Sequence, residues 1–383
     1  MDLFRISSYL CAAFNVPMVP FASKHVIFAG DFGQLPPPGC GQYSLYTASV
    51  ARANSALSAA GQKNVLGQGL WQLFTTVVIL RQNMRQLGTT DMDERYRIAL
   101  ENLRYKSCTR NDVELLCTRV SSAQAGHPHI SQARFRHASV ITALNAHRDA
   151  INEIGSRRFA EESGTSLSTF CSRDRLSRPS TRGSVRAMQR ADGNVRQMRR
   201  ATNIPLPPLQ RILWELPPSV TGHLPGKLNL CIGMPVMLKN NEATELCATN
   251  GAECEVVGWD SVDGLNGEKY LETLFVRLRG PPREVQLVGL PRNVVPVTAN
   301  TEKVLCMLPD DGLLVVARQQ PQVLPNFAMT DYGSQGRSRE NNVVDLRYCR
   351  SFQSVYTCLS RSTTYEGTLI LRPFDFSKMQ GGL

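Results

Sequence analysis

The residues best suited to phosphate chemistry lie near the end of the sequence, between Asn326 and Leu371. In this stretch Gly333 and Gly336 bracket a Ser-Gln pair, and glycine allows the backbone to come close to a phosphate group. The same stretch supplies three cations: Arg337, Arg339 and Arg361. Because guanidinium groups bind phosphate oxygens well, these residues predict a site that handles phosphate.

This stretch also alternates short apolar runs with polar segments. FAMT is followed by the turn DYGSQGRSRENN, the apolar run VVDL, a segment that ends in YTCLSRS, and the run GTLIL. We interpret this order as strand, turn, strand, helix and strand. In an α/β fold such an arrangement places polar residues at strand ends, where ligands bind.

The composition indicates a globular chain with an anionic partner. The 383 residues are enough for two or three domains, and 42% of them are apolar. The net charge of +11 favours nucleic acid over a membrane, since no amphipathic basic helix stands out and no apolar run approaches the roughly 18 residues of a membrane span. Charge alone leaves open that the chain is basic without binding nucleic acid.

The eleven cysteines are scattered, without a C-x-x-C or a Cys/His cluster at zinc-finger spacing. His127 and His129 form an isolated HPH, which we interpret as a loop. We therefore expect no metal site, reduced thiols and an intracellular location.

Two apolar runs in the first part of the chain are each followed by polar residues. After a predicted N-terminal amphipathic helix, Val26–Ala29 is typical of a buried strand and leaves Asp31 and Gln34 at its C-terminal end. A second predicted strand, Val77–Leu80, precedes RQNMRQ and its arginine Arg85. Polar side chains at strand ends again indicate a ligand site.

Helical periodicity covers residues 91–120, and SVITALNAHRDAIN then predicts a strand and a helix. Residues 157–211 differ, because twelve arginines, four acids and no lysine give them a net charge of +8. Their weak apolar periodicity predicts a mobile insertion. Three arginines at four-residue spacing could form a basic helical face: Arg182, Arg186 and Arg190. Two interpretations of this segment stay open: an auxiliary arm that contacts DNA, and a solvated insertion.

Short apolar segments separated by Gly, Asn and Pro turns come next. Five strands are predicted: Leu228–Ile232, Pro235–Leu238, Cys254–Trp259, Tyr270–Arg279 and Glu284–Leu287. Strands of this length and spacing predict a small barrel.

Several phrases resemble motifs of the PIF-type helicases, the petite integration frequency family of superfamily-one DNA helicases. GDFGQLPP resembles motif III, RQNMRQ resembles motif IV and YTCLSRS resembles motif VI. FAMTDYGSQGRSR resembles motif V, although Gly333 stands where the family has lysine. GMPVMLKNN and TNGAECEVVGW resemble the segment that precedes the family's inserted barrel. Taken together, these sequence motifs are most similar to those of fungal helicase-like proteins of the Helitron kind.

The resemblance implies an α/β fold with RecA-like motor domains, the first one incomplete, and an inserted small SH3-like β-barrel. It divides the chain into a remnant of the first RecA-like domain (1–78), the first part of the second (79–156), an Arg-rich mobile insertion (157–211), the SH3-like barrel (212–325), the C-terminal part of the second RecA-like domain (326–375) and a tail (376–383).

The resemblance also implies roles for individual residues. Arg361 would act as an arginine finger, Gln34 would sense the γ-phosphate, and Arg85 would reach the terminal phosphate. The implied nucleotide contacts are Asp31, Gln34, Arg85, Gln335, Gly336 and Arg361. The expected nucleic-acid contacts are Thr330, Ser334, Gln335 and Arg337, together with Arg182, Arg186 and Arg190.

Two motifs of the family are missing from the sequence. No GxxxxGK[ST] occurs in the 383 residues, and no Asp-Glu pair ends a strand upstream of Val26. The family uses these motifs to hold ATP and Mg²⁺, which we therefore expect in the complete parent and not on this chain alone. The resemblance implies the C-terminal portion of an N-terminally truncated, ATP-dependent helicase that moves 5′ to 3′ on single-stranded DNA or acts at DNA junctions.

Whether this chain is itself an enzyme stays open. Two alternatives are a non-enzymatic DNA-binding protein derived from a helicase and an incomplete gene fragment. A missing N-terminal segment or a second chain could carry the phosphate loop. A nuclear location, and a part in DNA repair, recombination or transposition, are expectations from the DNA partner alone.

Overall fold

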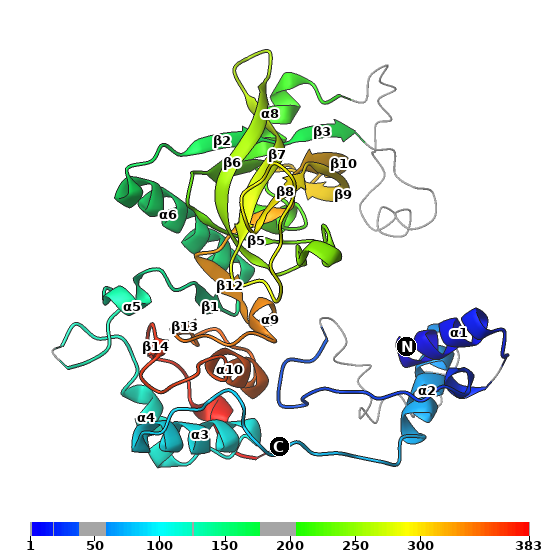
Figure 1. Cartoon of the computed structure of the whole chain (residues 1–383), viewed down its shortest axis with the longest axis vertical. Helices are drawn as coiled ribbons and strands as arrows, with labels where there is room; N and C mark the ends of the chain where they lie inside the picture. Colours follow the sequence, from blue (N-terminus) through cyan, green and yellow to red (C-terminus); the bar gives the residue numbers. More distant parts are fainter. Residues whose placement is uncertain (1, 18, 38–58, 125, 177–203, 383) are drawn as a thin grey trace.

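A parallel sheet forms the lower part of the molecule (Figure 1). The computed structural model describes residues 2–17, 19–37, 59–124, 126–176 and 204–382. Within these residues the sheet has the strand order β12-β1-β13-β14, with all neighbours parallel. Its strands are β1 (Val140–Thr142), β12 (Ala328–Thr330), β13 (Asn342–Asp345) and β14 (Thr368–Ile370). Each coincides with an apolar run of the sequence, which confirms the predicted α/β class.

Helices pack against this sheet. They are α3 (Asp91–Arg104), α4 (Arg110–Cys117), α6 (Asn145–Ser163), α9 (Asp331–Ser334) and α10 (Phe352–Leu359). Both α3 and α4 begin with a capping box, made by Thr90 with Asp93 and by Thr109 with Asp112. α3, α4 and α10 share one core with the sheet, which includes Tyr96, Leu103, Leu116, Ile141 and Leu359.

Helix α6 approaches the start of β12 closely, because Gly155 has no side chain. A Cβ atom added at Gly155 would lie 2.5 Å from the Cγ atom of Phe327. One turn earlier, the buried Asn152 accepts hydrogen bonds at Oδ1 from the backbone N–H groups of Phe327 (2.9 Å) and Ala328 (2.8 Å). The helix therefore holds the strand that leads into the predicted phosphate turn.

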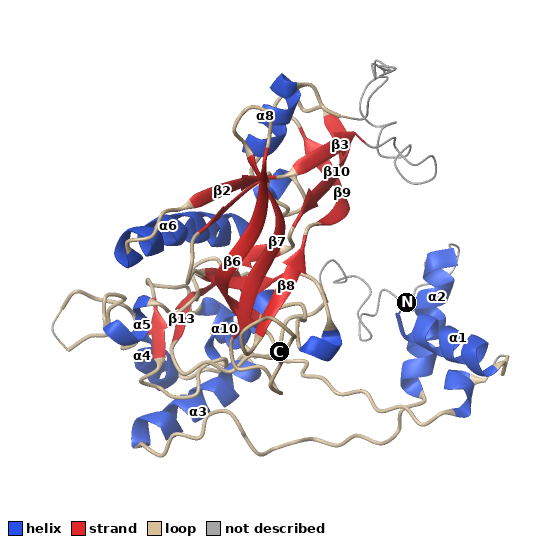
Figure 2. Ribbon diagram, turned by 45° about the horizontal axis from the view of Figure 1, so that its top comes forward, coloured by secondary structure: helices blue, strands red, loops and turns tan. Residues whose placement is uncertain are grey.

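The upper part contains a curved sheet that closes most of a barrel (Figure 2). Its strand order in the described residues is β11-β5-β6-β7-β2-β4, and β8 also pairs with β7. The strands are β2 (Ser168–Cys171), β4 (Lys227–Leu230), β5 (Pro235–Leu238), β6 (Glu253–Asp263), β7 (Lys269–Leu278), β8 (Val294–Thr298) and β11 (Val323–Pro325). Buried side chains alternate along β4, β5 and β7, as one apolar face requires.

A smaller antiparallel sheet extends this part. Its order is β3-β10-β9, formed by β3 (Arg173–Leu176), β10 (Leu313–Gln320) and β9 (Asn300–Met307). The helix α8 (Pro207–Glu215) packs on it through a core that includes Leu213, Leu216, Val304, Cys306 and Val316. Short helical turns complete this and the lower part: α5 (Ala133–Arg136), η4 (Pro218–Val220), η5 (Thr244–Leu246) and η6 (Ser377–Met379).

The prediction of a mobile insertion over residues 157–211 was wrong at both ends. Residues 157–163 finish α6, and β2, β3 and α8 also fall within the range. The arginines there are compatible with regular structure because carboxylates lie within reach: Arg158, for example, pairs with Glu162 one turn along α6. The expected basic face of Arg182, Arg186 and Arg190 lies outside the described residues.

Three predicted strands are absent from the described structure. Helices α1 (Asp2–Phe14), as predicted, and α2 (Ala59–Gln72) form, with the turn η1 (Pro20–Ser23). Val26–Ala29 and Val77–Leu80, however, are extended without pairing, and Ile27 is 92% and Leu80 86% exposed. A strand needs a neighbour to satisfy its backbone groups, and the described residues provide none there. Glu284–Leu287 runs as a loop, in which Val285 N–H donates to the Asn293 side chain (2.9 Å).

None of the helices in the described ranges is long and apolar enough to cross a membrane.

The Arg318–Asp174 pair holds β10 to β3 inside the upper part. Both side chains are 0% exposed, and Arg318 donates from Nε to Oδ1 and from Nη2 to Oδ2, each at 2.9 Å. Replacing Asp174→Ala leaves a buried cation without its counter-ion. We expect a loss of about 3–5 kcal/mol in the free energy of unfolding, measured by urea denaturation followed through tryptophan fluorescence.

The matched control is Glu272→Ala. This variant removes the carboxylate that pairs with Arg173, the residue before Asp174 in β3, and both side chains of that pair are exposed. Exposed pairs contribute about 0–1 kcal/mol, so this variant should unfold at nearly the wild-type urea concentration. If both variants lose the same free energy of unfolding, the buried Arg318–Asp174 pair does not stabilise this sheet more than an exposed pair does.

Candidate functional site

The turn after β12 brings buried polar groups to the end of the parallel sheet. Thr330 caps α9 by accepting a hydrogen bond from Gly333 N–H (3.1 Å). The Asp331 carboxylate, 5% exposed, accepts a hydrogen bond at Oδ2 from Ser354 Oγ of α10 (2.6 Å). Ser334, expected to contact nucleic acid, is fully buried and donates its hydroxyl to the Asp331 carbonyl (2.7 Å). Polar residues thus lie at a strand end, as the sequence pattern predicted, and the Ser354–Asp331 hydrogen bond also connects the turn to α10.

Arg361 lies directly after α10 and is fully buried. Its Nε donates to the Thr357 carbonyl (2.9 Å) and its Nη2 to Ser360 Oγ (2.8 Å), whereas Nη1 has no hydrogen-bond partner. Burial, with a smaller contribution from the Arg85 cation, lowers the pKa of Arg361 to about 10. The guanidinium therefore remains charged near neutral pH, with one buried donor unsatisfied.

The segment after the predicted second strand lies against Arg361 and its neighbours. Arg85 donates from Nε to Ser338 Oγ (2.9 Å) and from Nη1 to the Ser360 carbonyl (3.0 Å). Gln86 donates from Nε2 to the carbonyls of Ser360 (3.1 Å) and Ser362 (2.6 Å). The structure therefore brings together Arg85 and Arg361, which the resemblance alone placed at one site.

A cavity of about 400 Å³ opens beside this segment. Its lining residues include Arg85, Arg97, Arg104, Ser338, Tyr356 and Ser360. Arg361 is fully buried and does not line the cavity, whereas Ser360 and Tyr356 of the same region do. The Arg361 guanidinium is fully buried in this conformation, and residues 80–86 form one side of the cavity.

The GDFGQ loop also belongs to this region. Asp31 accepts hydrogen bonds from Gly33 N–H (2.9 Å) and from the Gln34 side chain (3.1 Å), and it forms an ion pair with Arg104 (3.1 Å). An added Cβ at Gly33 would lie 2.8 Å from the Cγ atom of Arg104, so glycine permits the close approach. The predicted γ-phosphate sensor Gln34 is thus bound to Asp31 in this structure.

The same loop contacts the turn that carries motif V. Tyr332 Oη donates to the Pro36 carbonyl (3.0 Å), and Gln335 Nε2 donates to the Leu35 carbonyl (3.4 Å). The predicted residues Asp31, Gln34 and Gln335 are therefore neighbours in space, although about 300 residues of sequence separate the first two from the third.

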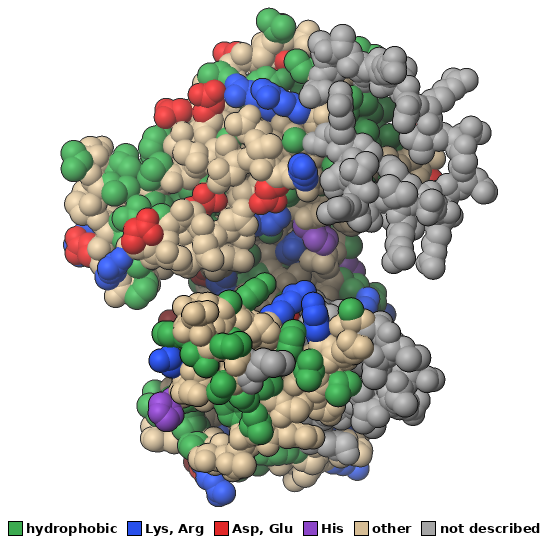
Figure 3. All heavy atoms as spheres, turned by 90° about the vertical axis from the view of Figure 1, so that its right-hand side faces the viewer, with side chains coloured by type: hydrophobic (Ala, Val, Ile, Leu, Met, Phe, Trp, Pro, Cys, Tyr) green, Lys and Arg blue, Asp and Glu red, His purple; other side chains and the backbone are tan. Residues whose placement is uncertain are grey.

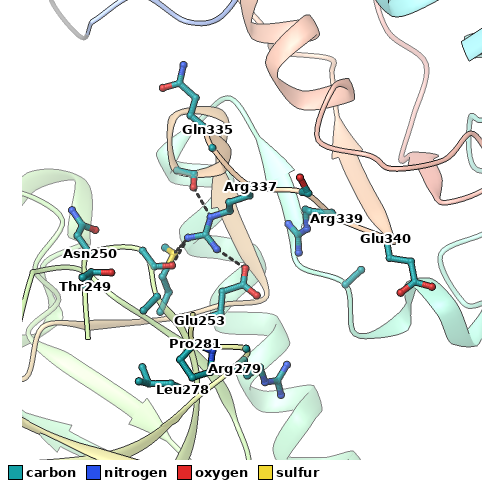
Figure 4. Close-up of a pocket in the computed structure, with 18 of the residues that line it drawn as sticks. Thr249, Asn250, Glu253, Leu278, Arg279, Pro281, Gln335, Arg337, Arg339 and Glu340 are labelled. Atoms are coloured by element: carbon teal, nitrogen blue, oxygen red, sulfur yellow. Dashed lines mark hydrogen bonds and ion pairs between the residues drawn. The ribbon is translucent and has the colours of Figure 1, made fainter. Parts of the chain in front are cut away.

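Arg337, expected to contact nucleic acid, bridges the turn and the barrel instead (Figure 4). Its Nε donates to the Gly333 carbonyl (2.9 Å), and the other two nitrogens reach the Glu253 carboxylate and the Gly251 carbonyl. Gly251 has a φ of +87°, and a Cβ there would lie 3.1 Å from Arg337 Nη2. Glycine is therefore needed at Gly251 both for its backbone conformation and for this contact.

Sequence patterns missed several members of the site. Arg104, Gln86, Ser338 and Tyr356 line the small cavity or contact the predicted residues, yet each looked like an ordinary helix or loop residue. Gln86 had one usable signal, its place in the phrase RQNMRQ beside Arg85. The role of Arg104 depends on a contact between segments distant in sequence, which no local pattern encodes.

Two guanidinium groups in this region have the chemistry to bind a phosphate group. The unsatisfied Nη1 of Arg361 would be satisfied by a phosphate oxygen, and Arg85 adds a second cation next to it. No group of three or more His, Cys, Asp or Glu side chains in the described ranges could hold a metal ion. The sequence likewise has no GxxxxGK[ST].

No family model matches the sequence, and no curated protein matches it. Solved structures match the fold. The Pif1 helicase from Candida albicans superposes with a TM-score of 0.57 and 18% identity, over 99% of this chain and 71% of that one. A Bacteroides Pif1 bound to single-stranded DNA gives a TM-score of 0.56 and 15% identity, over 100% and 69% of the two chains. The fold is therefore similar to that of Pif1 helicases, and the resemblance is confirmed as far as the fold is concerned.

Asp331 makes the stability of the phosphate turn depend on pH. Burial raises the pKa of Asp331 above the ordinary 3.8, although hydrogen bonds from Ser354 and from Tyr332 N–H oppose the rise. Its stabilising contribution is thus complete below pH 3.8 and is lost as the pH rises through the raised pKa. Asp331→Asn is neutral throughout, so we expect its stability relative to wild type to increase as the pH rises from about 4 to 7, measured by thermal unfolding.

The control is Asp93→Asn, at an aspartate with the opposite shift. Burial raises the pKa of Asp93, but hydrogen bonds from Tyr365 and Thr90 outweigh this and lower it overall. The stabilising contribution of Asp93 is therefore gained as the pH rises, so the stability of Asp93→Asn relative to wild type should change in the opposite direction to that of Asp331→Asn. A change of the same sign in both variants would show that the raised pKa of Asp331 is wrong.

Proposed function

We propose that this chain is the C-terminal portion of an ATP-dependent DNA helicase that moves 5′ to 3′ on single-stranded DNA. The observation that carries the proposal is the buried Nη1 of Arg361, which has no partner and lies beside Arg85 within a Pif1-like fold. A cation held in this way has the chemistry of an arginine finger. In this proposal the parallel sheet is the second RecA-like motor domain and the curved sheet is an SH3-like barrel.

The phosphate loop and the acidic metal site would come from outside these 383 residues, on another segment or another chain. A nucleotide held there would present its terminal phosphate to Arg361 once the segment around Arg85 has moved. An arginine finger raises the rate of phosphoryl transfer by roughly 10³ to 10⁵ only when the rest of the site is in place. The chain alone should therefore be inactive, or nearly so, as an ATPase.

Binding of single-stranded DNA is the part of the function that this chain would retain. Its net charge of +11 favours phosphate contacts, and basic side chains gather along the hollow between the upper and lower parts (Figure 3). The Bacteroides Pif1 with the same fold was solved with single-stranded DNA, and another structure of it also holds ADP-AlF3. A nuclear location and a role in repair, recombination or Helitron transposition are consistent with a DNA partner.

A DNA-binding protein that never hydrolyses ATP is the second candidate, favoured by the lack of GxxxxGK[ST]. The genomic sequence upstream of the coding region separates the two candidates. An in-frame GxxxxGK[ST] followed by a strand that ends in Asp-Glu supports the helicase. A stop codon with neither motif supports the DNA-binding protein.

The purified chain should bind DNA without using nucleotide. We expect salt to weaken the binding of a labelled oligothymidylate. A plot of log Kd against the logarithm of the salt concentration should be a rising straight line, since each phosphate contact releases counterions. Added ATP and Mg²⁺ should leave the affinity unchanged. Fluorescence anisotropy measures the binding, and a coupled assay measures phosphate release.

Two results would contradict this expectation. DNA-stimulated ATP hydrolysis by the purified chain would mean that it holds nucleotide without the family's loop. Failure to bind single-stranded DNA even at low salt would exclude both candidate functions.

A further inference from the structure

A second and larger cleft lies between the motif V turn and the barrel (Figure 4). It encloses about 1190 Å³ and is lined by the turn over residues 332–341, the β5–β6 connection around Asn250, the β7–β8 connection around Gly280, and α5 with the residues that follow it. It shares only Ser338 with the lining of the smaller cavity beside Arg85. It is therefore a separate surface of the molecule.

The charged lining of this cleft is mainly cationic. Its acids are Glu253 and Glu340, and its cations are Arg134, Arg279, Arg337 and Arg339. Three of the cations have a carboxylate partner: Arg337 with Glu253, Arg279 with Glu255, and Arg134 with Glu366. Arg339 has none among the described residues, and its nearest polar contact is the Met329 sulfur at 3.7 Å from Nη1.

Arg339 is held in this position by its backbone. Its N–H donates to the Arg361 carbonyl (2.8 Å), and its own carbonyl accepts a hydrogen bond from Thr363 N–H (3.0 Å). Burial lowers the pKa of Arg339; Glu253 partly offsets this, and the Arg337 cation adds to the lowering. The Arg339 side chain is partly buried and has no carboxylate partner among the described residues, so an anion in the cleft would supply its counter-ion.

We propose that Arg339 binds a phosphate group in this cleft, beside the Arg337–Glu253 pair. In Figure 4 the Arg339 guanidinium lies next to that pair, and no dashed line joins it to any residue drawn. The neutral side chains of Thr249, Asn250, Ser338 and Asn341 also line the cleft and offer further donors to phosphate oxygens. The phosphate group would come from the backbone of single-stranded nucleic acid or from free phosphate.

The size of the cleft, about 1190 Å³, favours the nucleic acid, and to that extent the inference rests on the proposed function. Because the Arg339 N–H donates a hydrogen bond to the Arg361 carbonyl, the backbone that carries the phosphate-binding residue is joined directly to the backbone of the predicted arginine finger. The site differs from the nucleotide site in its lining, its cations and its acids.

The test compares the full chain with Arg339→Gln, which removes the charge and keeps a polar side chain. We expect binding of a labelled oligothymidylate to weaken about tenfold at moderate salt, since a lost charge-assisted contact is worth about one factor of ten. The slope of log Kd against log salt should fall by about one. The control Arg110→Gln removes an equally charged side chain from the exposed face of α4 and should change the affinity less than twofold.

A second variant covers the case in which Arg339→Gln does not fold, as judged by circular dichroism. Glu253→Gln removes the acid closest to both cleft arginines and should tighten DNA binding by about threefold. The proposal is overturned if the variants that fold bind DNA as tightly as the wild type and respond to inorganic phosphate as the wild type does.

Inorganic phosphate separates the two sources of the ligand. If phosphate raises the melting temperature of the wild type but not of Arg339→Gln, while both bind DNA equally, the site exists and its ligand is free phosphate. If the wild type binds no single-stranded DNA but shows the same phosphate effect, the proposed function fails and the site stands. If neither DNA nor phosphate distinguishes the two proteins, Arg339 binds no anion.

Discussion

Three successive backbone carbonyls after α10 hold the polar centre of the lower part. Ser360 accepts hydrogen bonds from Arg85 and Gln86, Arg361 accepts from the N–H of Arg339, and Ser362 accepts from Gln86. Segments from three distant parts of the sequence therefore meet on one turn of backbone. Because these contacts are to carbonyls, they fix the path of the backbone and leave the Arg361 side chain with one nitrogen unpaired.

The upper and lower parts are joined through Arg337 and Asn152. Arg337 connects the turn after β12 to Glu253 and Gly251 of the barrel. Asn152 satisfies two backbone N–H groups where β11 leads into β12. Both contacts lie where the chain passes from the barrel to the parallel sheet. A displacement of the barrel would therefore also displace the turn that follows β12. Ser338 of this turn lines both clefts.

Much of the fold was predictable because its signals are local. The strands of the parallel sheet are compact apolar runs, α3 and α4 carry capping boxes, and four of the five barrel strands follow alternating patterns. The errors came where an apolar run needs a partner. Val26–Ala29 and Val77–Leu80 have the composition of buried strands, but a strand forms only beside another strand, and composition does not supply the neighbour.

The sequence by itself determined the kinds of residue available for phosphate chemistry and their order, with glycines at 333 and 336 and arginines at 85, 337, 339 and 361. It also determined the short strands that place them at sheet ends. Only the tertiary structure decided which arginine does what. Arg337 meets Glu253, Arg85 meets carbonyls, and Arg339 and Arg361 keep unpaired donors, because a guanidinium takes the nearest acceptor that folding brings to it.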